Sequence, residues 1–379
     1  MEFGLSQEQK YVKQMLEEFV KNEVDPIAAD IDESERYPME TVEKMGKYGI
    51  MGMPYPKEYG GAGTDYLSYI IAVEEMAKAC ATTSVILSSH VSLCCWPIFT
   101  FGTEEQKKKY LPNLLSGKKI GAFGLTEPNA GTDASAQQSV AVLEGDYYIL
   151  NGSKIFITNG GVADVFIIFA MTDRSKGVKG ISAFILEKGM LGFSVGKTEE
   201  KMGIRASSTT ELIFEDVKVP KENLLGKEGK GFSIAMKTLD GGRIGIAAQA
   251  LGIAEGALTE AIEYMKERTQ FGKKLTKFQG LQWYMADMKV RVDAAKHLVY
   301  KAAWKKSIGE NYTMDAAEAK LYAAETAMYV TNKSLQILGG YGYTKDYPLE
   351  RMLRDAKITE IYEGTSEVQK MVIANSLLH

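Results

Sequence analysis

Glu363 is the residue whose type and position are best suited to carry chemistry. It lies near the C-terminus in the stretch IYEGTSE, residues 361–367, and a glycine follows it. A carboxylate in such a place can take up a proton as a general base when the protein shields it from water, because shielding raises its pKa. A simpler role is also open. Thr365 or Ser366 would cap the following helix, and Glu363 would then only favour the helix dipole.

Two further stretches, both containing glycines, could contact a ligand. Residues 123–133, FGLTEPNAGTD, are dense in hydroxyl groups, and their glycines would let backbone N–H groups approach a planar ring or a phosphate. Residues 154–161, KIFITNGG, place Phe156 and Thr158 two apart on one face of a predicted strand. Each stretch also has a purely structural interpretation, the first as a turn between two domains and the second as a strand end with a hairpin turn.

A pair of glycines interrupts a long helical pattern at residues 239–243, LDGGR. Each glycine inside a helix costs about 1 kcal/mol relative to alanine, so something must offset that cost. Either another helix crosses closely, which is the commoner reason, or a ligand lies against the backbone. In the second case Asp240 and Arg243, which are three apart on one face, would reach polar groups of the ligand.

The elements that must position these stretches follow an α, β, α order. Capping boxes at Ser6 with Gln9 and at Thr103 with Gln106 begin two early helices. Helical spacing predicts further helical segments at 39–48, 66–78, 231–267, 276–308, 314–338 and 349–378. A hairpin is predicted at 140–151, and short apolar runs predict strands at 165–171, 181–186 and 211–214.

The grouping of the strands in the middle of the chain predicts an α+β fold. We expect an N-terminal α-helical domain at 1–120, a middle antiparallel β domain at 121–226 and a C-terminal helical domain at 227–379. No GxGxxG sequence follows a strand at the start of a helix. A Rossmann dinucleotide site is therefore not expected, and a nucleotide cofactor would have to be held in another way.

The composition narrows the possible function classes. The 379 residues include 45 basic and 49 acidic side chains, a net charge of -4, which gives no basic field for binding nucleic acid. The N-terminus does not resemble a signal peptide and no run of 18 apolar residues occurs, so we expect a cytoplasmic, soluble protein with no membrane segment. The three cysteines and three histidines have no metal-like spacing, so neither a metal site nor a disulfide is expected.

Taken in this order and spacing, the four stretches resemble the acyl-CoA dehydrogenase family over essentially the whole chain. The likeness is to its short-chain, butyryl-CoA-dehydrogenase-like branch, through GAFGLTEPNAGTDAS, GSKIFITN, LDGGRIGIAAQALG and DAKITEIYEGTSEVQ. The resemblance implies an N-terminal helical domain, a middle antiparallel β-barrel or sandwich-like domain and a C-terminal four-helix bundle. It also implies FAD as the cofactor.

The resemblance carries roles over to individual residues around FAD. The residues that would line the flavin or flank its ring system are Phe123, Leu125, Thr126, Thr132, Phe156 and Thr158. Those that would touch it from the start of the last helix are Thr365, Ser366 and Glu367. Those that would hold the pyrophosphate and adenine, partly from a neighbouring subunit, are Arg268, Gln279, Gln336, Gly339 and Gly340. A homotetramer built as a dimer of dimers is therefore implied.

The resemblance places Glu363 at the catalytic base, which removes the α-proton of an acyl-CoA thioester while a hydride leaves the β-carbon for the flavin. The product is a trans-2-enoyl-CoA. Because an α-C–H group is a very weak acid, the base must be stripped of water and the developing enolate oxygen must receive hydrogen bonds. By resemblance the donors are the Glu363 N–H and a flavin hydroxyl. The residues that would contact the substrate are Thr132, Asp240, Arg243 and Gly364.

Several alternatives stay open from the residues alone. The expected electron partner is an electron-transfer flavoprotein, whereas an oxidase would use oxygen, and an enoyl-CoA reductase in an electron-bifurcating complex would run the reaction in reverse. A non-catalytic acyl-CoA-binding protein would need no flavin. A short linear acyl chain is the first expectation for the substrate and an aryl-propenoyl chain the second. Cys94, Cys95 and Trp96 either set the chain length from the pocket floor or are ordinary core residues.

Overall fold

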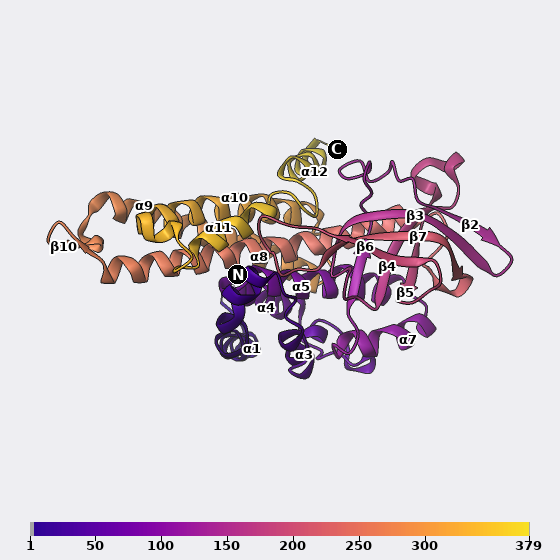
Figure 1. The fold of residues 1–379 in the computed structure, drawn as a ribbon, viewed down its shortest axis with the longest axis horizontal. Helices are drawn as coiled ribbons and strands as arrows, with labels where there is room; N and C mark the ends of the chain where they lie inside the picture. The colour runs from indigo at the N-terminus through magenta and orange to yellow at the C-terminus, as the bar shows by residue number, and fades with distance from the viewer. Residues whose placement is uncertain (1–3, 379) are drawn as a thin grey trace.

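The computed structural model describes residues 4–378. Figure 1 shows a sheet at one end of an elongated molecule, a long helical bundle that extends away from it, and N-terminal helices packed along both. The predicted α, β, α order is confirmed. The domain boundaries predicted at 120 and 226 stay a prediction, and the nearest element ends are those of helix α7 at Leu115 and strand β8 at Leu225.

Seven α-helices form the N-terminal part of the described chain. They are α1 (Gln7–Phe19), α2 (Ala28–Ser34), α3 (Met39–Lys47), α4 (Tyr66–Ala79), α5 (Ala81–Ser88), α6 (Trp96–Phe101) and α7 (Glu104–Leu115). Both predicted capping boxes form, at the starts of α1 and α7. A π-helical segment, Ser89–Cys95, joins α5 to α6.

The helical run Ala81–Phe101 is long and apolar enough to cross a membrane by length and composition alone. In the folded chain most of this run is buried inside the protein. The run is therefore a core helix here, and its apolar side chains are accounted for by packing.

The sheet has eight strands in the order β6-β7-β3-β2-β4-β5-β8, with β1 beside β4. Its strands are β1 (Gly121–Gly124), β2 (Val140–Glu144), β3 (Tyr147–Thr158), β4 (Val165–Met171), β5 (Ile181–Glu187), β6 (Phe193–Thr198), β7 (Thr209–Pro220) and β8 (Leu224–Leu225). The predicted hairpin is confirmed, as β2 and β3 joined at Gly145. Strand pairing is antiparallel except that β1 and β2 each pair in parallel with β4.

The C-terminal part is a bundle around one central helix. Its helices are α8 (Gly231–Glu267), α9 (Gln279–Ser307), α10 (Thr313–Leu338), α11 (Leu349–Ile358) and α12 (Ser366–Leu378), and a ribbon of β9 (Thr269–Gln270) and β10 (Lys273–Lys274) joins α8 to α9. Residues 244–254 of α8 are buried all the way round. A helical stretch that is buried on every side must be covered by other elements, and Figure 1 shows α8 running between α10 and α11 on one side and the N-terminal helices on the other.

Three expectations about elements were wrong in detail. Residues 349–378 do not form one helical segment, because the chain turns between α11 and α12 at Glu363 and Gly364 with positive φ angles of 53° and 94°. The stretch 123–133, interpreted as a loop, begins inside strand β1. Strand β6 was missed, because its side chains are mostly exposed or half-buried and carry no apolar run.

Candidate active site

A cavity of about 200 Å³ lies where the sheet, the α5–π segment, helix α8 and the turn before α12 meet. Nine residues predicted from the sequence line it: Phe123, Leu125, Thr126, Thr132, Phe156, Thr158, Arg243, Glu363 and Gly364. Sequence reasoning missed its other wall, which includes Val85, Ser89, Leu93, Met236, Leu239 and Tyr362. The first five are apolar or small helical residues, and their sequence pattern does not distinguish them from core residues, whereas Tyr362 lies in the turn beside Glu363.

The Glu363 carboxylate lies directly against the backbone of helix α8. A β-carbon built on Gly242 would lie only 2.0 Å from Oε2 of Glu363, so only glycine leaves room for this carboxylate. Oε2 is buried and has no hydrogen-bond partner among the described residues. The second glycine of the pair, Gly241, makes room in the same way for the side chain of Lys306, whose Nζ would lie 2.3 Å from an added β-carbon.

Burial dominates the electrostatics of this carboxylate. It raises the pKa of Glu363 from 4.5 to about 7, and the positive charges of Lys320 and Arg243 oppose the rise. An acid with a pKa near neutrality is ionised often enough to accept a proton and holds that proton strongly enough to remove it from a weak acid. An unpaired buried carboxylate costs stability, and groups held at such a cost are concentrated at functional sites.

The turn that carries Glu363 is held from three helices. Lys320 Nζ of α10 donates to the Gly364 carbonyl at 2.7 Å, and Gln369 Nε2 of α12 donates to the same carbonyl at 2.8 Å. The Tyr362 hydroxyl donates to the side-chain carbonyl of Gln249 in α8. A left-handed conformation is unfavourable for a residue with a side chain, so these bonds are needed to fix it.

The sheet side of the cavity presents an aromatic wall. Phe156 has a positive φ of 59° and its residue surface is 60% exposed, which is unusual for phenylalanine in a folded chain. Thr158 follows it on the same strand, β3, and both line the cavity. An exposed ring held in a strained backbone conformation is the arrangement expected of a surface that another flat molecule covers.

A buried ion pair supports the loop beyond β1. Lys154 Nζ donates to the Leu125 carbonyl at 3.2 Å, to Glu127 Oε1 at 2.7 Å and to Gln137 Oε1 at 3.0 Å. Burial lowers the pKa of Lys154 to about 8 against the opposing effect of Glu127. Glu127 also accepts from the main-chain N–H of Ser139 at 3.1 Å. The pair therefore fixes the loop that brings Leu125, and beyond it Thr132, to the cavity.

Arg243 faces the cavity from α8, but Asp240 does not line it. Arg243 Nη1 donates to Asp240 Oδ1 at 2.7 Å, and Thr313 Oγ1 donates to Asp240 Oδ2 at 2.8 Å. Arg243 Nε is buried without a partner among the described residues, as Oε2 of Glu363 is. The cavity is thus bordered by an unpartnered donor, Arg243 Nε, and an unpartnered acceptor, Glu363 Oε2. This pair suits a ligand that carries both a hydrogen-bond acceptor and a removable proton.

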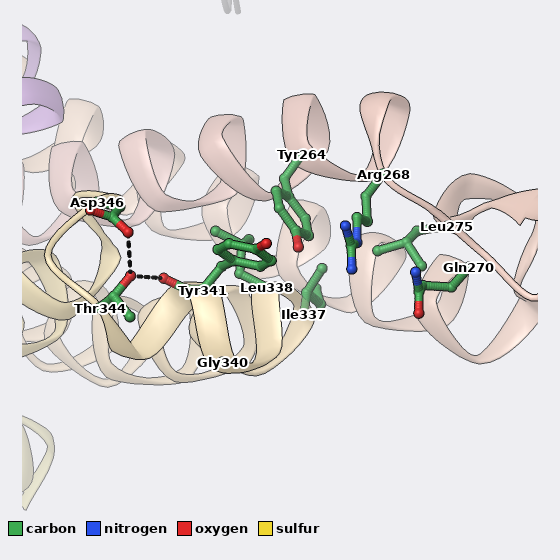
Figure 2. A pocket seen from close by; sticks show the side chains of 10 residues that line it. All are labelled: Tyr264, Arg268, Gln270, Leu275, Ile337, Leu338, Gly340, Tyr341, Thr344 and Asp346. Atoms are coloured by element: carbon green, nitrogen blue, oxygen red, sulfur yellow. Dashed lines mark hydrogen bonds between the residues drawn. The ribbon is translucent and has the colours of Figure 1, made fainter.

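The residues predicted to hold a pyrophosphate and adenine do not reach this cavity. Arg268 and Gly340 line a second cavity of about 490 Å³, drawn in Figure 2. It lies towards the end of the bundle where Figure 1 places β10, far from the sheet. Gln279 begins α9, Gln336 is in the last turn of α10, and Gly339 follows it with a positive φ of 61°; none of these three lines either cavity.

In the second cavity the guanidinium of Arg268 lies 5.5 Å from the centre of the Tyr341 ring, and both side chains point into the space between α8 and α10 in Figure 2. At the first cavity, Thr365, Ser366 and Glu367 directly follow the Glu363 turn without lining the wall. Thr365 Oγ1 accepts from the Val368 N–H at 3.3 Å and so caps α12, as one sequence interpretation predicted.

Cys94 and Cys95 do not line the first cavity. Both are fully buried, with Cys94 Sγ 3.8 Å from the Val165 carbonyl oxygen and Cys95 Sγ 3.4 Å from His90 Nε2. Cys94 and Cys95 therefore pack as core residues, and the role of Cys94, Cys95 and Trp96 in setting the chain length stays a prediction. Ser89 and Leu93, from the same π-helical segment, reach the wall instead.

Comparison with known proteins finds the same family along the whole chain. The N-terminal, middle and C-terminal domains of acyl-CoA dehydrogenases match residues 6–118, 122–217 and 229–378. The short-chain specific acyl-CoA dehydrogenase of Clostridium acetobutylicum is 71% identical over 377 residues, with both chains fully covered. The acryloyl-CoA reductase (NADH) of Anaerotignum propionicum is 53% identical, covering 100% of this chain and 96% of its own.

Among solved structures, one belongs to work on the electron transferring flavoprotein of Acidaminococcus fermentans and flavin-based electron bifurcation. It is 58% identical with a TM-score of 0.99, and both chains are fully covered. Sequence and fold both agree with the resemblance found in the four motifs. The chain belongs to the acyl-CoA dehydrogenase family.

Proposed function

We propose that this enzyme is an FAD-dependent dehydrogenase that converts a short-chain acyl-CoA to the trans-2-enoyl-CoA, with Glu363 as the base. The observation that carries the proposal is the Glu363 carboxylate, whose pKa burial raises to about 7 and whose Oε2 is buried with no partner among residues 4–378. It borders the same cavity as the exposed ring of Phe156. The 71% identity to a short-chain specific enzyme supports the substrate class.

The residues around the cavity fit FAD, the cofactor of this family. Phe156 and Thr158 offer a wall for a flat ring, and Arg243 Nε is a buried donor without a partner in the described part of the chain. When bound, the flavin would accept the hydride that leaves the β-carbon of the substrate. Phe123, Leu125, Thr126 and Thr132 would hold it from the loop that the Lys154–Glu127 pair fixes.

The chemistry of the chain itself centres on one proton. Oε2 of Glu363 would take the proton from the α-carbon, because shielding from water gives the carboxylate a proton affinity near that of the activated thioester. The main-chain N–H of Glu363 would donate to the thioester carbonyl, where negative charge develops. The close fit of the carboxylate against Gly242 would hold Oε2 at one position, which keeps the transfer distance short.

We infer that the enzyme is an oligomer in which the second cavity completes the cofactor site of another subunit. In support, Arg268 and Gly340 line a cavity far from Phe156, and nearby Phe271 and Trp283 are 93% and 63% exposed in the single chain. Large exposed apolar side chains favour a protein interface. By family resemblance the assembly is a homotetramer. Arg268→Ala should weaken FAD binding while leaving the fold unchanged, which absorbance and circular dichroism would measure.

The electron partner we propose is an electron-transfer flavoprotein, supported by the structural likeness to a chain from such work. The reverse direction, reduction of an enoyl-CoA, is the second candidate, because a relative 53% identical is an acryloyl-CoA reductase. In both directions Glu363 would exchange a proton with the α-carbon of the substrate, as a base in dehydrogenation and as an acid in reduction. Rates with butyryl-, hexanoyl- and cinnamoyl-type CoA esters, with ferricenium or the flavoprotein as acceptor, would identify the acyl group. Rates with the matching enoyl-CoA and a reduced donor would compare directions.

Substitution of the base tests the proposal. Glu363→Gln keeps the size of the side chain but removes the proton acceptor, so it should bind FAD and substrate and lose turnover by several orders of magnitude. Near-normal turnover by this variant would overturn the assignment. A purified chain that stays colourless after reconstitution with FAD would instead favour a non-catalytic acyl-CoA-binding protein.

A further inference from the structure

Lys320 is a buried lysine whose hydrogen bond goes to a main-chain carbonyl instead of a carboxylate. It lies in α10, its residue surface is 0% exposed, and its Nζ donates to the Gly364 carbonyl at 2.7 Å. Lysine is almost never fully buried without a strong reason, because its ammonium loses its hydration. The carbonyl it holds belongs to the residue directly after the proposed base.

The turn at Gly364 depends on this bond for its shape. Glu363 has a left-handed φ of 53°, which a residue with a side chain adopts only when its surroundings enforce it. The Gly364 carbonyl is fixed from two helices, by Lys320 of α10 and by Gln369 Nε2 of α12 at 2.8 Å. On its other side the Glu363 carboxylate presses against Gly242 of α8. A small rotation of the turn would therefore move the carboxylate away from its position against Gly242.

Lys320 also acts on Glu363 through its charge. Burial raises the pKa of the Glu363 carboxyl, and Lys320 is the stronger of the two cations that oppose this, the other being Arg243 of α8. The uncharged tyrosines that face Glu363 are Tyr362 of the turn and Tyr66 and Tyr69 of α4. The charged groups that act on Lys320 are Glu363, Arg243, Glu360 and Glu367. Without Lys320, the carboxylate would keep only Arg243, which already pairs with Asp240.

We propose that Lys320 is a positioning residue for Glu363: it holds the turn that places the carboxylate at the cavity wall and places a positive charge beside this carboxylate. The inference rests on the proposed function, since it deepens the role of the proposed base. Two separable effects follow, one from the hydrogen bond and one from the charge.

Three variants of the FAD-loaded enzyme separate these effects. Lys320→Gln keeps a donor but removes the charge, Lys320→Arg keeps the charge, and Gln369→Leu removes the other donor to the same carbonyl without changing any charge. The measurement is kcat as a function of pH. Lys320→Gln should move the acidic limb of the profile to higher pH by about one unit, since a neighbouring opposite charge lowers the pKa of an acid by one to three units. Lys320→Arg should keep the limb near its wild-type position.

Gln369→Leu is the matched control for positioning without charge. It should lower kcat and leave the acidic limb where it is. An unmoved limb in Lys320→Gln would overturn the proposal, as would an equal shift of the limb in Gln369→Leu. If the glutamine variant does not fold, Lys320→Arg decides, because a shifted limb in a folded variant that retains the charge contradicts the proposed role.

A second readout needs no turnover. Infrared difference spectra of protein labelled with ¹³C-glutamate, with Glu363→Gln as the blank, would follow the titration of the Glu363 carboxyl. This titration should move upwards in Lys320→Gln, and an unmoved titration would overturn the proposal even if kcat falls. The proposed function has its own test: normal turnover by Glu363→Gln would overturn the base assignment whatever the Lys320 variants do.

Discussion

Gly242→Ala tests the placement of the proposed base by adding a single methyl group. The β-carbon of alanine would lie 2.0 Å from Oε2 of Glu363 and 2.7 Å from Cδ2 of Leu93, whereas real β-carbon contacts are not closer than 3.0 Å. The carboxylate must therefore move by at least about 1 Å. A displacement of this size from the reacting geometry costs roughly 10²-fold in rate. We therefore expect kcat to fall about 100-fold.

The same substitution should leave the protein folded, because the preference for alanine over glycine in a helix interior, about 1 kcal/mol, offsets part of the roughly 1–3 kcal/mol cost of crowding Leu93. Loss of activity without loss of fold is thus the specific expectation, and the assays are kcat with a short-chain acyl-CoA, bound FAD and the midpoint of thermal unfolding. Gly245→Ala, one turn further along α8, is the control. Its β-carbon would meet only the Ser88 hydroxyl at 2.3 Å, and a serine side chain can rotate to another staggered position.

The Gly245 variant should therefore keep kcat within about twofold, since only the serine rotamer must change. Wild-type kcat in Gly242→Ala, with normal FAD binding, would refute the argument that the carboxylate reacts from the position seen against α8. Equal losses in both glycine variants would also refute it, because a general disturbance of the helix would then be the cause.

Three further predictions concern the base, the ion pair and the aromatic wall. Burial raises the folded pKa of Glu363 to about 7, above its ordinary 4.5, so the contribution of this group to stability is full below pH 4.5 and is lost as pH rises through 7. In FAD-free protein, Glu363→Gln should therefore raise the free energy of unfolding at pH 8, relative to pH 5, by up to about 3 kcal/mol in denaturant titrations. An effect independent of pH would contradict this prediction. Lys154→Met leaves the buried charge of Glu127 without its counter-ion and should cost about 3–5 kcal/mol of unfolding free energy, partly recovered by adding Glu127→Gln. Wild-type stability of the single variant would argue against a structural pair. Phe156→Ala should weaken FAD binding about fivefold in fluorescence titrations, since one ring contact is worth about 1 kcal/mol, and unchanged affinity would exclude Phe156 from the flavin wall.

Much of the fold could be predicted because its strongest signals are local. The α8 pattern at 231–267 coincides with the observed helix, and the capping boxes at Ser6 and Thr103 both form. The cap of α12 at Thr365 was one of the interpretations of the sequence, but the left-handed turn before it could not be predicted. That turn is enforced by bonds from Lys320 of α10 and Gln369 of α12, which the local pattern around Glu363 does not show.

The candidate site was predictable where residue types are unusual and not where ordinary residues meet across the fold. The glycine pair was recognised as unusual, and two explanations were open, a closely crossing helix or a ligand. In the structure, Gly242 makes room for the Glu363 carboxylate and Gly241 makes room for the Lys306 side chain. No local pattern connects Lys154 with Glu127, because they are brought together only when β3 packs against the loop after β1. The roles of the site residues in FAD and substrate binding stay predictions.

The most direct test of the account is hydrogen exchange at the α-carbon of a bound thioester. The substrate analogue would be an acyl-CoA with sulfur at the β-position, from which no hydride can leave, incubated with FAD-loaded enzyme in D₂O and followed by mass spectrometry. Wild-type enzyme should exchange the α-hydrogen for deuterium, and Glu363→Gln should lose this exchange by several orders of magnitude while still binding the analogue. Equal exchange by both proteins would contradict the claim that the buried Glu363 carboxylate is the base.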